Sequence, residues 1–79
     1  MRKGLDVEVP RDDGAPSRAR RLIAALVAGE LNGEELDRAQ LLVSELVSNA
    51  VLHGRGAIRL KAILDQDRLL VEVSDEGSA

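Results

Sequence analysis

Three polar side chains recur at intervals of four residues in a segment that is otherwise rich in leucine, valine and alanine. They are Glu45, Asn49 and His53. On an α-helix, each step of four residues overshoots a full turn by only about 40°, so the three side chains lie along one stripe. A carboxylate can act as a general base, an amide oxygen can coordinate a hard cation, and an imidazole can donate a hydrogen bond to phosphate. The spacing therefore predicts a polar stripe that contacts a ligand.

The length of the stripe restricts the kind of ligand. From Glu45 to His53 the helix axis advances about 12 Å. One metal ion with ligands at about 2 Å cannot reach both ends, so a zinc site built on all three residues is disfavoured. An extended anion such as a triphosphate with its magnesium ion fits the length. Asn49, in the middle, offers a neutral oxygen that Mg²⁺ accepts when phosphate oxygens and water supply most of its shell.

Each residue of the stripe also has a purely structural interpretation. Asn49 can be an amide with satisfied hydrogen bonds, and Glu45 can be a solvated side chain. His53 precedes Gly54 and can be a helix-end residue that the helix dipole favours. The combination in one apolar helix is rarer than any of the three alone, and both interpretations stay open from the stripe itself.

A second candidate lies near the end of the chain, where Asp75-Glu76-Gly77 follows an alternating apolar segment. An aspartate carboxylate can accept a hydrogen bond from the exocyclic amine of adenine. A glycine lets the backbone turn where a side chain would block a flat ring. Asp-x-Gly alone occurs in many turns, but its place after a strand and downstream of the stripe favours a binding site.

The N-terminal part of the chain predicts a strand followed by a helix. Residues 5–9 alternate between apolar and acidic side chains, as in a half-buried strand, and Pro10 ends this pattern. Residues 11–16 form a charged loop with one glycine. We expect Ser17 to be the N-cap of a helix over about 17–29.

The polar stripe belongs to a second helix. Asn32 and Glu35 match a capping box, and the helix that they open is expected to run to about His53. Gly54 is expected to end it in a left-handed conformation. Its apolar positions cover so much of the circumference that we expect a central helix; they are Leu36, Ala39, Leu41, Leu42, Val43, Leu46, Val47, Ala50, Val51 and Leu52.

A hairpin completes the predicted fold. Residues 58–64 and 69–74 show the period of two that is typical of strands, and residues 65–67 form the turn. Residues 54–56, with the sequence Gly-Arg-Gly, follow a helix and precede a strand, which is the wrong order for a dinucleotide fingerprint. We interpret them as a simple turn. The order β-α-α-β-β predicts the α+β class, with a two-layer α/β sandwich.

Composition excludes several classes of function. The chain has 79 residues, a formal net charge of −3, no cysteine and no aromatic residue. A general nucleic-acid binder needs a basic face, and no aromatic ring is available to stack on a base. Disulfides and thiolate metal sites are impossible. No stretch approaches the roughly 20 apolar residues of a membrane span, and we expect a cytoplasmic protein.

The polar stripe followed by a hairpin that ends in Asp-x-Gly resembles the Bergerat-type ATP site of the GHKL ATPases. Within this superfamily the chain looks most like the bacterial anti-sigma-factor serine/threonine kinases. The resemblance implies a histidine-kinase-like ATPase fold that binds ATP and Mg²⁺. It implies that Asn49 coordinates magnesium, that Glu45 is the catalytic base and that His53 lies near the phosphates. Asp75 would contact the adenine amine, and Gly77 would shape the floor of the pocket.

The resemblance also implies partners and a departure from the family pattern. Such kinases phosphorylate a serine on an antagonist protein, bind a sigma factor and usually form homodimers. The family continues past Asp-x-Gly into an ATP lid and a second Gly-rich box, which have no counterpart in residues 1–79. We therefore expect one truncated domain, inactive on its own in phosphoryl transfer. The alternatives are a non-catalytic regulatory module that binds a sigma factor or antagonist through the first strand and first helix, and an unrelated small α/β domain.

Overall fold

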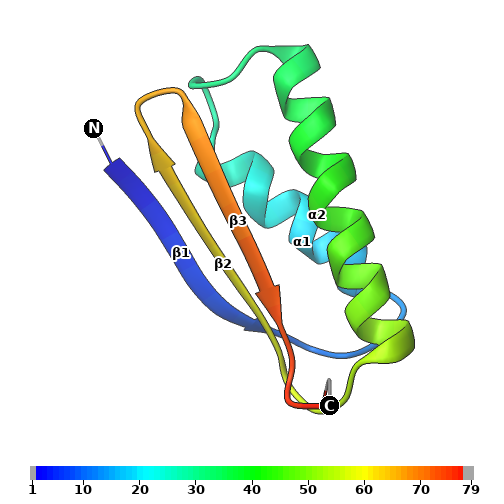
Figure 1. Ribbon diagram of the computed structural model, residues 1–79. Coiled ribbons are helices and arrows are strands. Elements are labelled where there is room, and N and C mark those ends of the chain that lie inside the picture. Colours follow the sequence, from blue (N-terminus) through cyan, green and yellow to red (C-terminus); the bar gives the residue numbers. More distant parts are fainter. Residues whose placement is uncertain (1, 78–79) are drawn as a thin grey trace.

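The computed structural model describes residues 2–77, which form five elements in the predicted order. Strand β1 (Arg2–Val9) is followed by helix α1 (Ala15–Leu26), helix α2 (Gly33–His53), and strands β2 (Ile58–Asp65) and β3 (Arg68–Ser74). The strands form one antiparallel sheet in the order β1-β2-β3. Both helices lie on the same face of this sheet (Figure 1). The predicted α+β two-layer sandwich is confirmed.

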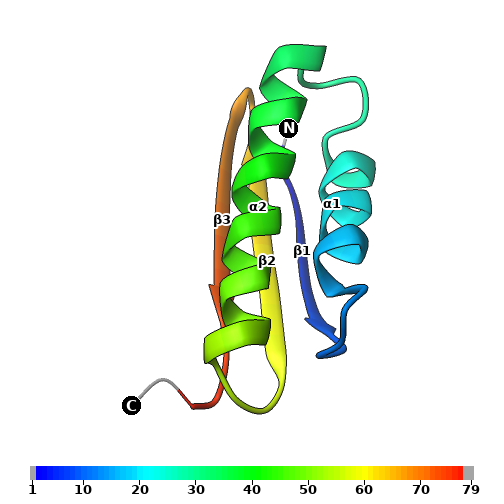
Figure 2. The ribbon, with the colours of Figure 1, turned by 90° about the vertical axis from the view of Figure 1, so that its right-hand side faces the viewer.

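The two layers enclose an aliphatic core. Helix α1 contacts β1 and β2, whereas α2 contacts β2 and β3, and the two helices contact each other (Figure 2). No polar or charged side chain among the described residues is buried. The buried side chains come from all elements except β3, with Val27 following α1, and are Val9, Ala15, Ala19, Ile23, Val27, Val43, Val47, Ala50, Ile58, Leu60, Ala62 and Leu64. Burial of this apolar surface holds the helices on the sheet.

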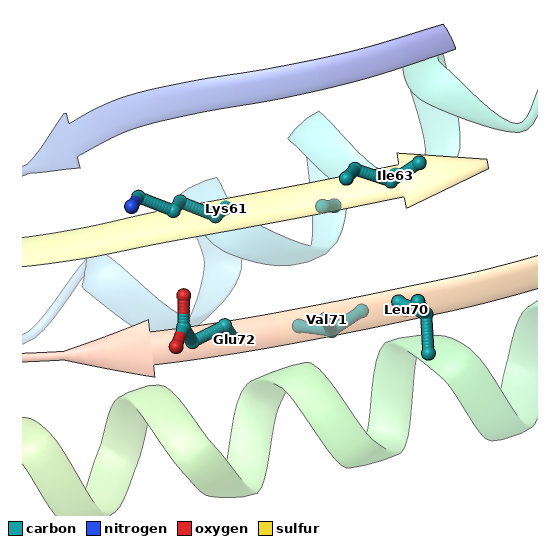
Figure 3. A pocket seen from close by; sticks show the side chains of 6 residues that line it. Lys61, Ile63, Leu70, Val71 and Glu72 are labelled. Atoms are coloured by element: carbon teal, nitrogen blue, oxygen red, sulfur yellow. The ribbon is translucent and has the colours of Figure 1, made fainter. Parts of the chain in front are cut away.

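The other face of the sheet carries side chains that alternate with those of the core. Lys61 on β2 lies opposite Glu72 on β3, and Ile63 lies opposite Leu70. Between these side chains is a shallow hollow of about 260 Å³ on the face turned away from the helices (Figure 3). It contains none of the residues that the sequence analysis selected, so the candidate site must lie elsewhere.

Helix α1 begins and ends earlier than predicted, and the assignment of Ser17 as its N-cap is wrong. Gly14 is the N-cap residue, and its N–H donates to the carboxylate of Asp12 at 2.8 Å. Pro16 lies in the first turn, where its missing N–H removes no helical hydrogen bond. Ser17 is inside the helix, and its hydroxyl accepts a hydrogen bond from Arg20. Pro16 in the first turn and the Asp12 carboxylate at the N-cap favour a helix that begins before Ser17.

Helix α2 has the predicted bounds and the predicted N-terminus. The side chain of Asn32 accepts from the N–H of Glu35 at 2.8 Å, and the Glu35 carboxylate accepts from the N–H of Asn32 at 3.0 Å. The expectation of a central helix is wrong for the described part of the chain, because Leu41, Leu42 and Leu52 are 60%, 50% and 72% exposed. One face of α2 packs on the sheet.

No helix among residues 2–77 combines the length and apolar character needed to cross a membrane.

Candidate functional site

The rotation of α2 decides where the polar stripe points. Val43, Val47 and Ala50 are buried against the core. Because they lie on the sheet-facing side, Asn49 and His53 are placed at the flank of the helix, where their side chains are exposed. The apolar face therefore positions two members of the stripe at a surface next to β3.

Strand β3 brings the aspartate to the same surface. Leu69, Val71 and Val73 alternate toward the helices and are half-buried. Asp75 follows Val73 by two residues and stays on the helix side of the sheet. Figure 1 shows the end of β3 beside the segment that leaves α2. The resemblance to a Bergerat-type ATP site implies that the stripe and the aspartate share one site, and this parity lets the structure bring three of the four residues together.

Asn49, His53 and Asp75 line one open hollow of about 180 Å³. The remaining lining residues are apolar or glycine and come from α2, from the residue after it and from β3; they are Leu46, Ala50, Gly54 and Val73. Pockets that enclose a whole small molecule measure roughly 300–1,000 Å³. This hollow is therefore large enough for one part of a nucleotide, such as a flat base, and the rest of the ligand would lie outside it.

Gly54 allows the aspartate to approach the end of α2. A Cβ atom at this position would lie 2.6 Å from Cγ of Asp75 and 2.8 Å from the carbonyl oxygen of Ala50. The prediction of a left-handed conformation is wrong, because φ is −92° and ψ is −171°, which any residue adopts. The glycine is required by the close packing of Asp75 over its Cα and not by its backbone angles.

The two remaining candidates do not line the hollow. Gly77 donates its N–H to Oδ1 of Asp75 at 2.9 Å, so it holds the carboxylate in place. A Cβ at Gly77 would lie 2.8 Å from Cδ of Arg55, which shows how closely the two segments meet. Glu45 is exposed on α2, one helical turn before Asn49 and outside the hollow.

A comparison with known protein families bears on this arrangement. The sequence model of the histidine kinase-like ATPase domain matches residues 9–79. The chain belongs to the histidine kinase-like ATPase family. The matched range includes the whole polar stripe and the Asp-x-Gly segment. Since the family is one of ATPase domains, ATP is the ligand that membership implies.

Several curated relatives of this histidine kinase-like ATPase chain are anti-sigma F factors. An anti-sigma F factor of Clostridium acetobutylicum is 38% identical over 63 residues, which cover 72% of this chain and 44% of that protein. Anti-sigma F factors of Bacillus thuringiensis and Bacillus mycoides are each 30% identical over 83 residues, covering 98% of this chain and 57% of those proteins. The chain spans about half the length of the curated relatives that it matches.

Within this histidine kinase-like ATPase domain, two charged residues that sequence reasoning missed hold the site together. Arg11 donates from Nε to the carbonyl oxygen of Gly56 at 2.9 Å and from Nη1 to those of Ala50 and Val51. Nothing in the sequence marked this arginine, because its partners lie 39–45 residues away. The second residue is Glu76, the middle residue of Asp-x-Gly.

The carboxylate of Glu76 accepts a hydrogen bond from the N–H of Ala57 at 2.7 Å. The backbone N–H of Glu76 donates to the carbonyl oxygen of Arg55 at 2.9 Å. The segment after β3 is thereby fastened to residues 54–57, which connect α2 to β2. The interpretation of Gly-Arg-Gly as a simple turn is incomplete, since this segment is the support of the hollow.

The donor set of the site limits how a metal ion can bind. Among residues 2–77, no three histidine or acidic side chains gather closely enough to hold a metal ion by themselves. Asn49 offers one amide oxygen at the hollow. A magnesium ion at this position would take most of its ligands from phosphate oxygens and water, as Mg²⁺ does in nucleotide sites.

Proposed function

We propose that this chain is the nucleotide-binding part of a regulator of the anti-sigma-factor kinase type, and that the hollow between α2 and β3 receives the adenine end of ATP. The observation that carries this proposal is that Asn49, His53 and Asp75 line one hollow, with the Asp75 carboxylate packed against Gly54. Residues 1–79 form one domain unit in this proposal. Family membership and the shared name of the relatives support it.

Asp75 is proposed to recognise the base. Its carboxylate has only acceptor atoms when ionised, and the exocyclic amine of adenine is a donor. Ala50 and Val73 supply apolar walls against which a flat ring can pack, and Gly54 lets the carboxylate lie close against its Cα. Gly77 orients the carboxylate through its N–H. A base with a carbonyl oxygen at the position of the adenine amine would place an acceptor against the acceptor atoms of the carboxylate. Binding of such a base is therefore disfavoured.

Asn49 and His53, on the α2 side of the hollow, are proposed to contact the phosphate end of the ligand where it leaves the hollow. Asn49 would give Mg²⁺ one neutral oxygen while the phosphates complete its shell, and bound magnesium would offset phosphate charge. His53 would donate a hydrogen bond to a phosphate oxygen. Glu45 is proposed as the base that accepts the proton of an attacking hydroxyl. Its place outside the hollow and one turn before Asn49 is compatible with an attacking group that approaches from solvent.

The proposed reaction of the whole protein is transfer of phosphate to a serine or threonine of an antagonist protein. The proposed partners are that antagonist and a sigma factor, as the name of the relatives suggests. We also propose a cytoplasmic location and a homodimer, both from the resemblance to bacterial anti-sigma-factor kinases. Light scattering of the purified chain would test the dimer directly.

The alternative function is a regulatory module that binds its protein partner and no nucleotide. One observation favours it: the hollow of about 180 Å³ is smaller than a pocket for a whole nucleotide. In this case β1 and α1 would provide the protein-binding surface, and the hollow would have no ligand.

Isothermal titration calorimetry with Mg-ATP separates the two functions. We expect the parent chain to bind and Asp75→Asn to weaken binding about tenfold or more, because the amide oxygen accepts the N–H of Gly77 and the amide NH2 then faces the adenine amine. Asn49→Ala should weaken binding of Mg-ATP more than that of metal-free ATP. Arg59→Ala, which removes an exposed ion pair with Asp6 on the other face of the sheet, is the control. A parent chain that captures a sigma factor or antagonist while binding no nucleotide would overturn the nucleotide proposal.

A further inference from the structure

The end of α2 is contacted by a guanidinium from a distant loop. Arg11 follows β1 and lies in the loop before α1. The last four carbonyl groups of an α-helix have no partner within the helix. Arg11 Nη1 donates to one of them, that of Val51, at 3.0 Å, and also to the carbonyl of Ala50, which accepts the N–H of Gly54 as well. A cation at this end is also favoured by the helix dipole.

The same side chain reaches beyond the helix. Its Nε donates to the carbonyl oxygen of Gly56 at 2.9 Å, inside the connection formed by residues 54–57. On its other side, this connection is bound by Glu76 through the carbonyl of Arg55 and the N–H of Ala57. The 54–57 connection is thus held by one charged side chain from the β1–α1 loop and by one from the segment after β3.

These contacts set the distance across the hollow. His53 and Gly54 lie at the end of α2, where Arg11 binds, and Asp75 packs over Gly54. Asp75 immediately precedes Glu76. Any displacement of the 54–57 connection therefore moves the carboxylate relative to Asn49 and His53.

The small expected contribution of Arg11 to the stability of the fold favours a role in positioning other segments. Its Nη2 is buried without a hydrogen-bond partner in the described chain. Burial of an unpaired polar nitrogen costs free energy, which offsets part of what the other three hydrogen bonds contribute. The net contribution of Arg11 to the stability of the fold is reduced accordingly. Its three hydrogen bonds still fix the β1–α1 loop, the end of α2 and the 54–57 connection relative to one another.

We propose that Arg11 is a positioning residue of the nucleotide site: by joining the end of α2 to the 54–57 connection, it fixes Asp75 at the distance from Asn49 and His53 that the ligand requires. Arg11 does not line the hollow and acts through these residues. The inference rests on the proposed nucleotide-binding function. It extends that function by a residue from a segment far from both motifs.

The test uses the 79-residue chain and two measurements on each variant. Amide hydrogen exchange by NMR, without nucleotide, reports the N–H groups of Glu76 and Ala57, which bridge the segments, and that of Leu60 in the central strand. Calorimetry then reports the Kd for Mg-ATP at a temperature where circular dichroism shows a fully folded protein. The variants are Arg11→Ala and Arg11→Lys, with Arg59→Ala as the matched arginine control on the other face of the sheet.

In Arg11→Ala we expect exchange at Glu76 and Ala57 to become about tenfold faster while exchange at Leu60 stays unchanged. The Kd should rise about tenfold. Arg11→Lys, which retains the charge and can reach one carbonyl, should restore part of both effects. Arg59→Ala should change neither. Should Arg11→Ala fail to fold, Arg11→Lys and Glu76→Ala, which frees the 54–57 connection from the opposite side, replace it.

Three results would overturn the proposal. Exchange that rises equally at Leu60 would mean general destabilisation. Unchanged exchange at Glu76 would mean that Arg11 does not hold the connection. A normal Kd despite faster exchange would mean that the connection does not position the ligand. A parent chain without affinity for Mg-ATP would instead overturn the proposed function, and the exchange data would still decide whether Arg11 holds the segments together.

Discussion

The two ends of the molecule are stabilised in different ways. At the end that carries the hollow, hydrogen bonds join residues far apart in sequence: Arg11 and Ala50 are 39 residues apart, and Ala57 and Glu76 are 19 apart. At the opposite end, α2 begins with a capping box between residues three apart and an Arg38–Glu34 ion pair four apart. We call these the site end and the cap end. The start of α2 at the cap end is determined locally, with one long-range ion pair between Lys3 and Glu30 beside it, whereas the site end depends on the assembled fold.

This difference has a consequence for the effect of substitutions. A change at the cap end alters the free energy of one helix terminus and leaves the rest of the structure in place. A change at the site end disturbs the segments before α1, after α2 and after β3 together. Variants at matched residue types in the two ends should therefore separate effects on stability from effects on ligand binding.

The largest effect on stability and binding is expected from Gly54→Ala. In Gly54→Ala the new Cβ would lie 2.6 Å from Cγ of Asp75, so the carboxylate must move. We expect a loss of about 1–3 kcal/mol in the free energy of unfolding, as in overpacked sites, together with loss of Mg-ATP binding. Gly33→Ala is the control, because a Cβ there meets nothing within 4 Å and lies in the first turn of α2.

Gly33→Ala should raise the free energy of unfolding by about 0.5–1 kcal/mol, since alanine loses less conformational freedom in a helix. Urea unfolding followed by circular dichroism measures both variants. Equal destabilisation of the two would show that the space beside Gly54 is not what constrains the site end. Binding of Mg-ATP by Gly54→Ala with unchanged affinity would contradict the placement of Asp75 in the site.

The predictability of each region from sequence follows the same division. The capping box of Asn32 and Glu35 was predicted and is confirmed, because both partners lie within one helical turn. The strands were predicted because alternation is a property of neighbouring residues. Contacts of Arg11 left no local signal, since the side chain looks like any charged loop residue until the fold brings the end of α2 to it.

The candidate site was predictable only in part, less than the capping box and more than the contacts of Arg11. The convergence of Asn49, His53 and Asp75 was expected from the helical spacing of the stripe and from the resemblance to a Bergerat-type ATP site. In the structure, helical spacing and strand parity fix the direction of each side chain. Glu45 was placed with them by spacing alone, and the structure leaves it outside the hollow. Gly54 was assigned a conformation from its position after a helix. Its actual constraint comes from Asp75, which lies on another element, and no local pattern contains that information.

A smaller effect is expected at the cap end from Asn32→Ala. The substitution removes the acceptor of the Glu35 N–H in the capping box. We expect the free energy of unfolding to fall by about 1 kcal/mol, which is typical for loss of an N-cap side chain. Affinity for Mg-ATP should not change, because the hollow lies at the other end of α2. Urea unfolding and calorimetry check the two parts, and a weakened affinity would mean that the ends are coupled through the helix.

The smallest effect concerns Asp12, next to Arg11 at the site end. A hydrogen bond from Arg18 and, secondarily, one from the N–H of Gly14 hold the pKa of the Asp12 carboxyl below its ordinary value of 3.8. A lowered pKa in the folded state means that the ionised form is favoured by folding. Its contribution to stability is therefore complete above the unfolded value and is lost as the pH falls through the folded pKa. The carboxylate is exposed to solvent, so this contribution is small and screened by salt.

Asp12→Asn keeps an oxygen for the N–H of Gly14 and removes the charge that Arg18 contacts. The difference in unfolding free energy between the parent and this variant should be constant between about pH 5 and pH 7. It should shrink as the pH falls below about 3.8 and through the lower pKa of the folded carboxylate. Urea unfolding at several pH values measures the difference. Added salt should reduce it at neutral pH, because an exposed ion pair is screened. Because the amide keeps the acceptor for Gly14, a difference that persists at low pH cannot come from the charge of Asp12 and would contradict the role assigned to its contact with Arg18.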